Sequence, residues 1–261
     1  MIDYEETRKL LLSVTGFDIG YYKPDQMKRL LSTIVTRSGA HDIEAYIKLL
    51  RHDGRAVEAF RNSITINVSQ FFRDNKPFYV LEKIMLPELF KMGTNLEIWS
   101  AGCASGEEPY SVAMLLEENK PSETQYSVFA TDIDAAAIKK AETAYYSPKG
   151  IEGVSLLRLR KYFEKTKDGY VAGSLLKSKV TFKRQDLTNS LIKSKFHLAL
   201  CRNVVIYFTD EYKRKIYQNV VKALVPGGIL FVGSAETLLN YREFGLEKLE
   251  TYFYRKAVVK R

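Results

Sequence analysis

The stretch Glu97-Ile98-Trp99-Ser100-Ala101-Gly102-Cys103-Ala104-Ser105-Gly106-Glu107-Glu108-Pro109-Tyr110-Ser111 decides the fold of this chain. Leu96 to Trp99 predict a buried strand, and the small residues that follow predict a turn. Pro109 favours a helix, because proline at a first helical turn has its φ already fixed and lacks only an amide proton that would have no partner there. Gly102 and Gly106 allow close approach to a ligand, and the helix N-terminus offers unpaired amides. This order of elements is typical of nucleotide-binding sites.

Two carboxylates open the predicted helix. Glu107 and Glu108 stand where a phosphate-binding loop would carry a lysine, and they would repel a phosphate. We therefore expect a ligand that offers hydroxyl groups and positive charge. Glu107 is predicted to face this ligand, whereas Glu108 is explained by its favourable interaction with the helix dipole.

Composition and length favour a folded protein with a sizeable core. The chain has 261 residues, of which 46% are hydrophobic and 27% charged, so disorder is not expected. Cys103 and Cys201 lie far apart without metal-site spacing, and the N-terminus shows no signal-peptide pattern, which predicts a reduced cytoplasmic protein. No apolar run approaches the ~20 residues that a membrane span requires.

Positive charge is concentrated in one region. The formal net charge is +9, and residues 139–195 contain 14 Lys and Arg against 5 Asp and Glu, an excess that equals the whole net charge. A basic region can meet nucleic acid, an anionic membrane or an acidic protein, or can be a solvated surface. The sequence leaves these four readings open.

The first segment, to about residue 75, is predicted to be helical. Pro24 and Asp25 begin a helix with one apolar face, formed by Met27, Leu30, Leu31, Ile34 and Val35. Arg29 and Arg37 fall on its outer face with Lys28 at the margin, where they are solvated or meet an acidic partner helix. Further helices are predicted over residues 43–50, 56–64 and 78–91.

From Leu96 onward, strands and helices alternate. This alternation predicts a mostly parallel sheet covered on both faces, the shape expected of a Rossmann-like methyltransferase, with an antiparallel hairpin over residues 246–259 at its edge. Residues 148–179 interrupt the rhythm and predict a small inserted β subdomain, because a structureless loop of that length would be unusual. The predicted strands are 96–99, 126–130, 180–184, 197–201 and 229–232, and the helices are 108–119, 135–145 and 210–224.

Polar residues follow three further predicted strands, at the edge where such sheets bind ligands. Asp132 is placed to accept hydrogen bonds from ribose hydroxyls, whereas Asp134 is better explained as a helix N-cap. Asp186 could accept from an adenine amino group with Leu187 against the ring, or could simply close a turn. After the fourth strand, Arg202 and Asn203 need partners to offset their desolvation, either a ligand or neighbouring loops. The three histidines are isolated, so a metal centre is not expected.

Four motifs together resemble the chemotaxis receptor methyltransferases of the CheR type. The resemblance covers essentially the whole chain, and it is specific because all four motifs occur in order. They are Asn67-Val68-Ser69-Gln70-Phe71-Phe72-Arg73, Ser105-Gly106-Glu107-Glu108-Pro109-Tyr110-Ser111, Ala130-Thr131-Asp132-Ile133-Asp134 and Cys201-Arg202-Asn203-Val204-Val205-Ile206-Tyr207-Phe208.

This resemblance implies an α/β methyltransferase domain over residues 76–261, with the insert at about 148–179, preceded by an all-helical domain and linker over 1–75. It implies that S-adenosylmethionine methylates glutamate side chains of chemoreceptors and leaves S-adenosylhomocysteine, without a metal. Arg73 and Tyr207 match active-site positions. Asp186 and Leu187 match the pair near the adenine, where many relatives carry asparagine in place of Asp186. The positions that match cofactor contacts are Asn67, Ser69, Arg73, Gly102, Glu107, Asp132, Asp186, Leu187, Asn203 and Val204.

The same resemblance assigns partners. The basic residues Lys28, Arg29 and Arg37 are expected to contact the chemoreceptor's helical cytoplasmic domain, and the protein is expected to be a monomer without stable nucleic-acid binding or membrane insertion. The insert lacks the glycine pattern associated with binding of a receptor C-terminal peptide, so its charge suggests direct contact with a receptor. Two alternatives are a methyltransferase acting on RNA, which the basic charge would permit, and a non-catalytic adaptor that senses the cofactor.

Overall fold

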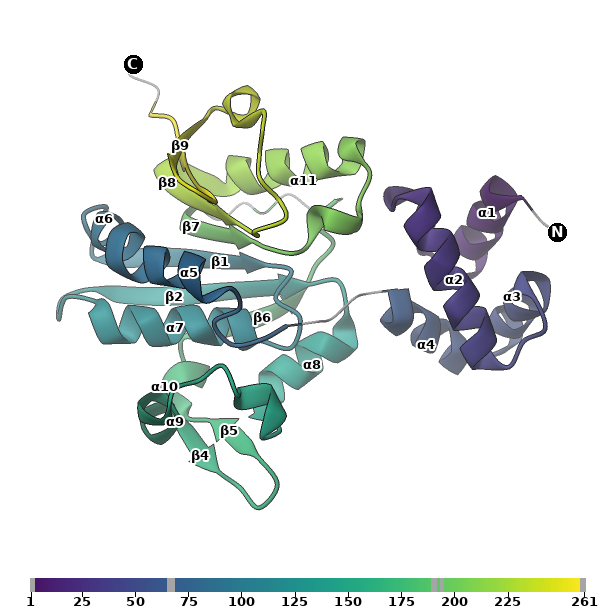
Figure 1. The fold of residues 1–261 in the computed structure, drawn as a ribbon, viewed down its shortest axis with the longest axis horizontal. Helices are drawn as coiled ribbons and strands as arrows, with labels where there is room; N and C mark the ends of the chain where they lie inside the picture. The colour runs from purple at the N-terminus through teal and green to yellow at the C-terminus, as the bar shows by residue number, and fades with distance from the viewer. Residues whose placement is uncertain (1–2, 65–68, 189–191, 193–194, 259–261) are drawn as a thin grey trace. The chain divides into compact units, whose positions relative to one another are not determined.

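The computed structural model describes residues 3–64, 69–188, 192 and 195–258, which form two compact units (Figure 1). One unit contains the N-terminal helices together with Tyr207–Arg214, and the other contains Asn67–Ile206 and Lys215–Arg261. We refer to them as the helical unit and the α/β unit, and each is described by itself.

The helical unit packs four helices around an apolar core. They are α1 (Tyr4–Thr15), α2 (Pro24–Ser38), α3 (Ile43–His52) and α4 (Gly54–Ile64), with the short 3-10 helix η1 (Ile19–Tyr21) after α1. The predicted start of α2 at Pro24 is confirmed, and Met27, Leu31 and Ile34 from its apolar face are buried in the core. Gly39 ends α2 at a φ of 76°, a conformation that glycine adopts without steric cost.

A segment distant in sequence completes this unit. The backbone amide of Lys23 donates to the carbonyl of Tyr207 at 3.0 Å, and the amide of Thr209 donates to the carbonyl of Tyr21 at 3.0 Å. The rings of Tyr22 and Phe208 stack with centroids 4.8 Å apart. The chain at Tyr207–Arg214 is thus held to the N-terminal helices by backbone pairing and aromatic contact.

The α/β unit is built on a seven-stranded sheet of order β6-β2-β1-β7-β8-β10-β9. The five strands from β6 to β8 are parallel, and the C-terminal hairpin pairs antiparallel to β8, which confirms the predicted sheet and its edge hairpin. The strands are β1 (Asn95–Ala101), β2 (Gln125–Asp132), β6 (Val180–Arg184), β7 (Phe196–Cys201), β8 (Leu224–Val232), β9 (Leu246–Glu250) and β10 (Phe253–Lys256).

The predicted helices follow their strands. They are α7 (Glu107–Asn119), α8 (Ala135–Thr143) and α11 (Asp210–Ala223). The order in which the chain adds strands reverses between β1 and β7, although the strands themselves stay parallel. The strands β2 and β6 lie on one side of β1, whereas β7 and β8 lie on the other. In open α/β sheets, a ligand binds outside the carboxyl ends of the strands at such a reversal. The topology therefore directs attention to the turns that follow β1 and β7.

The helix before β1 differs from the prediction. Instead of one regular α-helix over 78–91, the structure has α5 (Asn75–Val80), a π-helical turn at Leu81–Met85 and α6 (Leu86–Phe90). Pro87 lies in the first turn of α6 and offers no amide proton to the preceding turn. The wider π turn directly before it accommodates that missing hydrogen bond.

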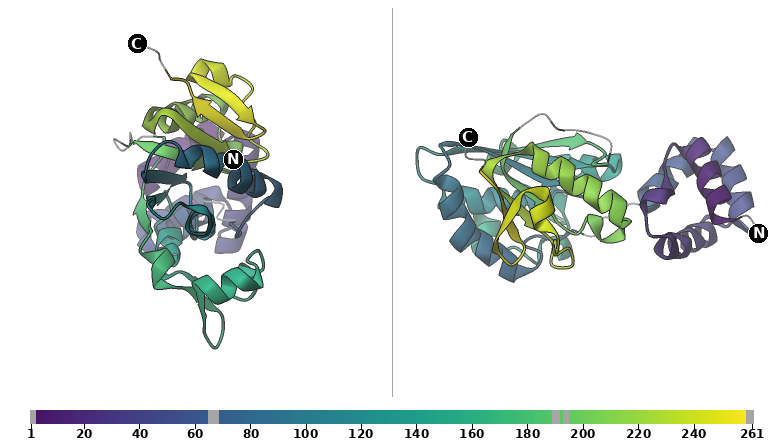
Figure 2. Two further views of the ribbon diagram at one scale, coloured as in Figure 1. Left: turned by 90° about the vertical axis from the view of Figure 1, so that its left-hand side faces the viewer. Right: turned by 90° about the horizontal axis from the view of Figure 1, so that it is seen from above.

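Residues after α8 form a second, three-stranded sheet of order β3-β5-β4. Within the predicted insert, Tyr170–Ala172 is a strand, β5, and it pairs with β3 (Tyr145–Tyr146) and β4 (Phe163–Lys165). Two short helices, α9 (Leu156–Tyr162) and α10 (Ser174–Lys177), accompany this sheet, and further 3-10 turns lie at Lys149–Ile151, Val205–Tyr207 and Tyr241–Phe244. Figure 2 shows the β4–β5 hairpin projecting from the main sheet.

Candidate functional site

The turn after β1 touches the turn after β7. Gly102 has a φ of 84°, and a Cβ atom at this position would lie 2.3 Å from Cγ2 of Val204. Only glycine therefore fits, because both the backbone conformation and the contact exclude a side chain. The amides of Gly102 and Cys103 donate to the carbonyl of Thr131 at 2.7 and 2.9 Å, which also holds this turn to the end of β2. Three predicted site segments thus meet at one edge of the sheet.

We expect Gly102→Ala to weaken binding of the cofactor that the resemblance implies, S-adenosylmethionine, by at least about tenfold, because Cβ must displace Val204 and strain the left-handed backbone. Calorimetric titration with S-adenosylhomocysteine measures this loss. Gly39→Ala is the matched control, since Gly39 has a similar φ of 76° but a Cβ atom there would meet no other atom within 4 Å, so this variant carries only the backbone strain. Equal affinity losses in both variants would contradict the contact argument.

Glu107 places a buried carboxylate at the first residue of α7. Its residue is 8% exposed, and Oε2 has no hydrogen-bond partner among the described residues. Burial raises the pKa of Glu107, while a hydrogen bond with Ser69 and the charge of Lys140 act in the opposite direction. A buried carboxylate oxygen without a donor is unfavourable. This atom can therefore accept a hydrogen bond from a ligand that brings a hydroxyl or ammonium donor, and the contact of Glu107 with such a ligand remains a prediction.

Asp132 ends β2 and faces the same turn. Its Oδ2 accepts from the Ala104 amide at 2.8 Å and its Oδ1 from the Asp134 amide at 2.9 Å. Burial raises the pKa of Asp132, and these amide hydrogen bonds partly offset that effect. Each oxygen keeps a second lone pair that can accept from a ligand hydroxyl. The neighbouring Asp134 caps α8 by accepting from the amides of Ala136 and Ala137, as predicted.

Asp186 closes a local turn. Its Oδ1 accepts from the Thr188 amide at 2.8 Å and from the Thr188 hydroxyl at 2.6 Å, which accords with the simpler of the two sequence interpretations. Leu187 is 9% exposed, and its carbonyl accepts from the side chain of Asn219 at 3.0 Å. Contacts of Asp186 and Leu187 with an adenine ring remain a prediction.

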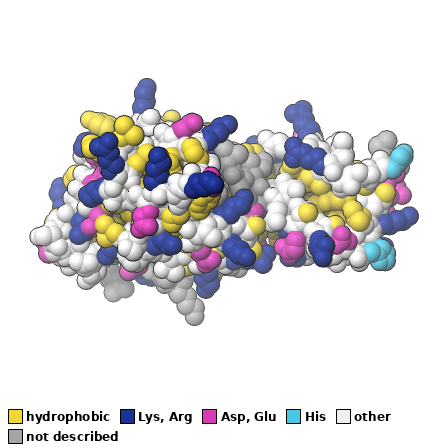
Figure 3. Space-filling model, turned by 90° about the horizontal axis from the view of Figure 1, so that it is seen from below, with side chains coloured by type: hydrophobic (Ala, Val, Ile, Leu, Met, Phe, Trp, Pro, Cys, Tyr) yellow, Lys and Arg dark blue, Asp and Glu magenta, His cyan; other side chains and the backbone are white. Residues whose placement is uncertain are grey.

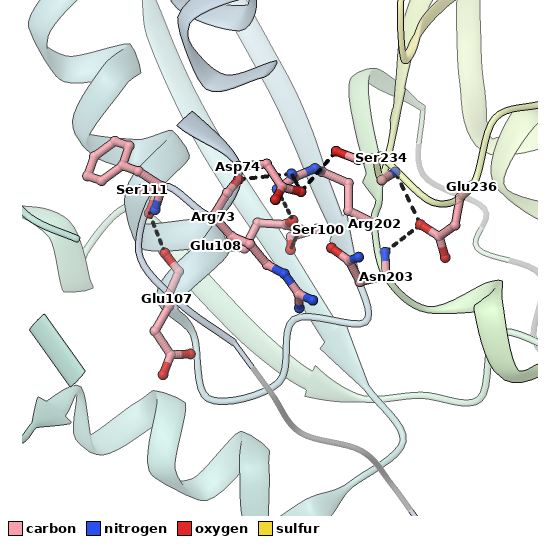
Figure 4. A network of polar contacts seen from close by, with 12 residues as sticks. Arg73, Asp74, Ser100, Glu107, Glu108, Ser111, Arg202, Asn203, Ser234 and Glu236 are labelled. Atoms are coloured by element: carbon pink, nitrogen blue, oxygen red, sulfur yellow. Dashed lines mark hydrogen bonds and ion pairs between the residues drawn. The ribbon is translucent and has the colours of Figure 1, made fainter. Parts of the chain in front are cut away.

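The loop after β7 depends on an acid that the sequence interpretation missed. Asn203 has a φ of 58°, which is uncommon for a residue with a side chain. The buried carboxylate of Glu236 accepts from the backbone amide of Asn203 (Figure 4). It also accepts from the amides of Val205 and Gly233, at 2.7 and 3.1 Å. Glu236 therefore fixes the backbone that carries Asn203 and Val204. The only sequence signal was an acid shortly after the predicted strand at 229–232, which an ordinary turn also explains.

Arg202 ties the linker before α5 to helix α7. Its side chain is 1% exposed, and Nη1 lies 3.3 Å from Oε2 of Glu108. Nη2 donates to the carbonyl of Arg73 at 3.0 Å and lies 3.2 Å from Oδ2 of Asp74. Its guanidinium also lies over the rings of Phe78 and Phe231, at 5.1 and 4.5 Å from their centroids. Of the two kinds of partner that the sequence left open for Arg202, a ligand or neighbouring loops, these contacts are with protein groups. Arg202 thus holds the Arg73 linker against α7.

Glu108 has a larger role than the helix dipole alone suggests. Its carboxylate pairs with Arg202 through Oε2, and Oε1 accepts from the Ser100 hydroxyl at 2.8 Å. Burial raises the pKa of Glu108, while the positive charges of Arg202 and Arg73 lower it. The two neighbouring acids therefore differ: the Glu108 carboxylate is paired with Arg202 and Ser100, whereas Oε2 of Glu107 has no hydrogen-bond partner among the described residues.

Arg73 is carried by a tightly held linker. Phe71 and Phe72 are 2% and 6% exposed, and the amide of Phe72 donates to the Ser111 hydroxyl at 3.0 Å. The Ser111 hydroxyl in turn donates to the carbonyl of Glu107 at 2.6 Å. Figure 4 shows the Arg73 side chain extending from this linker on the same side of the sheet as Glu107 and Asn203. The linker thus brings a cation to the edge where the predicted cofactor residues meet.

The other predicted site residues belong to other segments of the chain. Tyr207 is part of the helical unit, where its carbonyl pairs with the Lys23 amide, and its catalytic role remains a prediction. Asn67 lies outside the described residues. Three basic residues of α2 are exposed, as predicted for its outer face: Lys28, Arg29 and Arg37.

Metal ligands and membrane spans can be assessed over the described ranges. Residues 3–64, 69–188, 192 and 195–258 contain no group of three or more His, Cys, Asp or Glu side chains arranged to hold a metal ion. Over the same ranges, no helix has both the length and the apolar character needed to span a bilayer. Cys103 and Cys201 are free, and burial raises the pKa of both thiols well above the usual value.

The chain matches two family models and several curated proteins. Residues 67–253 match the CheR methyltransferase SAM-binding domain, and residues 2–65 match the CheR methyltransferase all-alpha domain. A chemotaxis protein methyltransferase of Listeria monocytogenes is 35% identical over 256 residues, covering 98% of this chain and 97% of that protein. Chemotaxis protein methyltransferase 1 of Pseudomonas aeruginosa is 32% identical and covers 91% of each chain.

Among solved structures, the N-methyltransferase NodS from Bradyrhizobium japonicum in complex with S-adenosyl-L-homocysteine is 18% identical. The match covers 62% of this chain and 63% of that one, with a TM-score of 0.36. The two family models together span nearly the whole chain, and the curated relatives match it over nearly their full length. The chain therefore belongs to the CheR family of S-adenosylmethionine-dependent methyltransferases.

Proposed function

We propose that this protein transfers the methyl group of S-adenosylmethionine to glutamate side-chain carboxylates of chemoreceptors, giving glutamyl methyl esters that serve sensory adaptation. The observation that carries the proposal is the meeting of Glu107, Asp132 and Asn203 with the Arg73 linker at one edge of the sheet. Acidic groups suit the hydroxyls and ammonium of the cofactor, and a cation suits an anionic methyl acceptor.

The residues present fit the cofactor. Oε2 of Glu107, which has no hydrogen-bond partner within the described part of the chain, can accept from its ammonium or a hydroxyl, and Asp132 can accept from ribose hydroxyls through its remaining lone pairs. Asn203 and Val204 would form the opposite wall, held by Glu236. Ser69, Gly102, Asp186 and Leu187 are proposed as further contacts, together with Asn67.

When bound, S-adenosylmethionine supplies an electrophilic methyl group on a positively charged sulfur. A carboxylate acceptor needs no general base, because it is already deprotonated at neutral pH. What the protein must supply is alignment of the carboxylate with the methyl group and exclusion of water. We assign the orientation of the acceptor to the planar guanidinium of Arg73, and we propose that Tyr207 also positions a reacting group.

Methylation of receptor-containing membranes tests the proposal. Purified protein and S-adenosylmethionine labelled in the methyl group are expected to place label in chemoreceptors, and mild alkali should release it because carboxyl esters are base-labile. Alkali-stable label, or label in RNA, would refute carboxyl methylation. Cofactor binding without any transfer would favour the alternative of a non-catalytic adaptor.

We further propose that the outer face of α2 binds the acidic methylation helices of the receptor. Reversing charge at Lys28, Arg29 and Arg37 together should raise KM for receptor about tenfold or more at low ionic strength, since each lost attraction becomes a repulsion. Kinetics at varied receptor concentration measure this, with kcat and cofactor affinity unchanged. The matched control reverses three exposed residues of other N-terminal helices, Lys9, Lys48 and Arg51. An equal rise in KM for the control would refute a site on α2.

The proposal also covers the location, the oligomeric state and the domain division of the protein. We propose that the chain acts in the cytoplasm as a monomer. We also propose that the chain has two functional domains. Residues 1–75 form a helical domain and linker, and residues 76–261 form a methyltransferase domain with an insert at about 148–179. Sedimentation at several protein concentrations tests the monomer, and limited proteolysis at the boundaries tests the division.

A further inference from the structure

Helix α9 exposes two adjacent leucines beside two cations. Leu156 and Leu157 are 73% and 78% exposed, among the highest values for large hydrophobic residues in the described chain. Residues four apart lie on the same helical face, so Arg160 lies one turn beyond Leu156 and Lys161 one turn beyond Leu157. Both cations are exposed. We call these four residues the α9 patch.

The opposite face of α9 is engaged within the protein. The Arg158 guanidinium donates to the Glu118 carboxylate at 2.7 Å and lies 4.4 Å from the centroid of the Phe72 ring. Tyr162 is 2% exposed and belongs to the main core. These contacts fix which side of the helix faces outward, so the exposure of the α9 patch follows from the packing of its other side.

Positive charge extends around the patch. Residues 148–179 contain eight Lys and Arg against three Asp and Glu. Lys165, Lys167 and Lys177 are exposed on the adjoining β4–β5 hairpin and α10, and Leu175 on α10 is 43% exposed. Figure 3, which views the side where this sheet projects, shows Lys and Arg side chains interspersed with hydrophobic ones and with some Asp and Glu.

We propose that the α9 patch docks on an anionic lipid surface. Leucine side chains can enter the boundary between headgroups and acyl chains, while Arg160 and Lys161 extend their charged ends to anionic headgroups. Each cation near such a surface contributes an attraction of about fivefold in affinity. This mode is peripheral and needs no membrane-spanning helix.

Other occupants fit the same surface less well. A second copy of the chain would bring two surfaces of the same positive sign together. Nucleic acid would use the cations but gain nothing from two projecting leucines. Protein interfaces are depleted in lysine relative to the rest of a surface, whereas six of the eight cations in residues 148–179 are lysines, at positions 149, 161, 165, 167, 177 and 179. A lipid surface uses both the leucines and the lysines.

Vesicle sedimentation of the full-length protein tests the proposal. We expect binding to vesicles of phosphatidylglycerol and phosphatidylcholine in equal parts at low ionic strength, weaker binding at high salt, and little binding to phosphatidylcholine alone. Replacing Leu156→Ser together with Leu157→Ser should weaken binding about tenfold. Reversing Arg160→Glu together with Lys161→Glu should weaken it by at least about thirtyfold, from about fivefold for each lost attraction, because the new carboxylates also repel the headgroups.

Two matched controls keep the result specific. Leu239→Ser removes another exposed leucine, 86% exposed in the turn after β8, and Lys9→Glu with Lys48→Glu makes the same charge change on the helical unit. Both should bind vesicles like the unaltered protein, and circular dichroism should show all variants folded. The proposal is overturned if the leucine variant binds vesicles as tightly as the unaltered protein. It is also overturned if the control variants lose as much vesicle binding as the patch variants.

The remaining outcomes identify other occupants. One such outcome is that the protein does not bind anionic vesicles but binds a soluble chemoreceptor cytoplasmic fragment through Leu156 and Leu157. The α9 patch would then have a protein partner. Self-association that disappears in the leucine variant would indicate a second copy. Either result overturns lipid docking while leaving the proposed methyl transfer intact, since that activity is measured separately.

Discussion

Arg73→Ala is expected to reduce methyl transfer by about a thousandfold while changing S-adenosylhomocysteine affinity less than about threefold. The reason is that the linker places the Arg73 cation at the cofactor edge of the sheet, where we assign it to orienting the acceptor carboxylate. Removing an orienting group lowers the rate of the chemical step more than it lowers binding. Arg73→Lys should restore little activity, since an ammonium group lacks the planar fork that matches a carboxylate.

Single-turnover transfer and calorimetric titration separate these two effects. Lys76→Ala is the matched control, because Lys76 is an exposed cation three residues further along, in the first turn of α5. It should leave both the rate and the affinity near those of the unaltered protein. If Arg73→Ala abolished binding of S-adenosylhomocysteine as well, Arg73 would have to be reassigned from the acceptor to the cofactor.

Arg202→Met is expected to lower the free energy of unfolding by about 3–5 kcal/mol. Methionine keeps an unbranched apolar chain against Phe78 and Phe231, but the buried carboxylate of Glu108 loses its cationic partner. The carbonyl of Arg73 also loses its donor, so the linker is held less firmly. Activity should therefore fall together with stability.

Urea unfolding followed by tryptophan fluorescence measures this loss, because the single Trp99 is buried in β1. Adding Glu108→Gln to Arg202→Met should recover part of the stability, since it removes the unpaired charge. Arg255→Met is a control in which an arginine pairs with a glutamate at a more exposed position, 34% for Arg255, and its effect should be much smaller. Losses of equal size for Arg202 and Arg255 would contradict the role given to burial.

The order of elements in the fold was predictable because it rests on short-range patterns. The apolar spacing after Pro24 predicted α2, and the strand, glycine turn and Pro109 predicted β1 and α7. The π turn before α6 could not be located, because the chain can respond to Pro87 by a kink, a break or a widened turn, and the surrounding packing selects among them.

For the candidate site, the sequence predicted which strand ends would carry polar side chains. It placed Asp132 beside the glycine turn through the rule that carboxyl ends of parallel strands share one edge. It assigned Glu107 to the ligand and Glu108 to the helix dipole, but it could not show that Glu108 pairs with a buried arginine. That pairing depends on Arg202, 94 residues away from Glu108 in sequence, and on the direction each side chain takes from the first turn of α7.

The sequence by itself determined the strand, the glycine turn and the acidic helix start between Glu97 and Ser111, since these follow from backbone chemistry within a few residues. It also determined the family, because the motifs are read in order along the chain. Only the tertiary structure decided that Glu236 holds the amides around Asn203 and that Arg202 anchors the Arg73 linker. These contacts join residues 33 and 129 positions apart, and their partners are selected by burial and geometry that arise only when the sheet is formed.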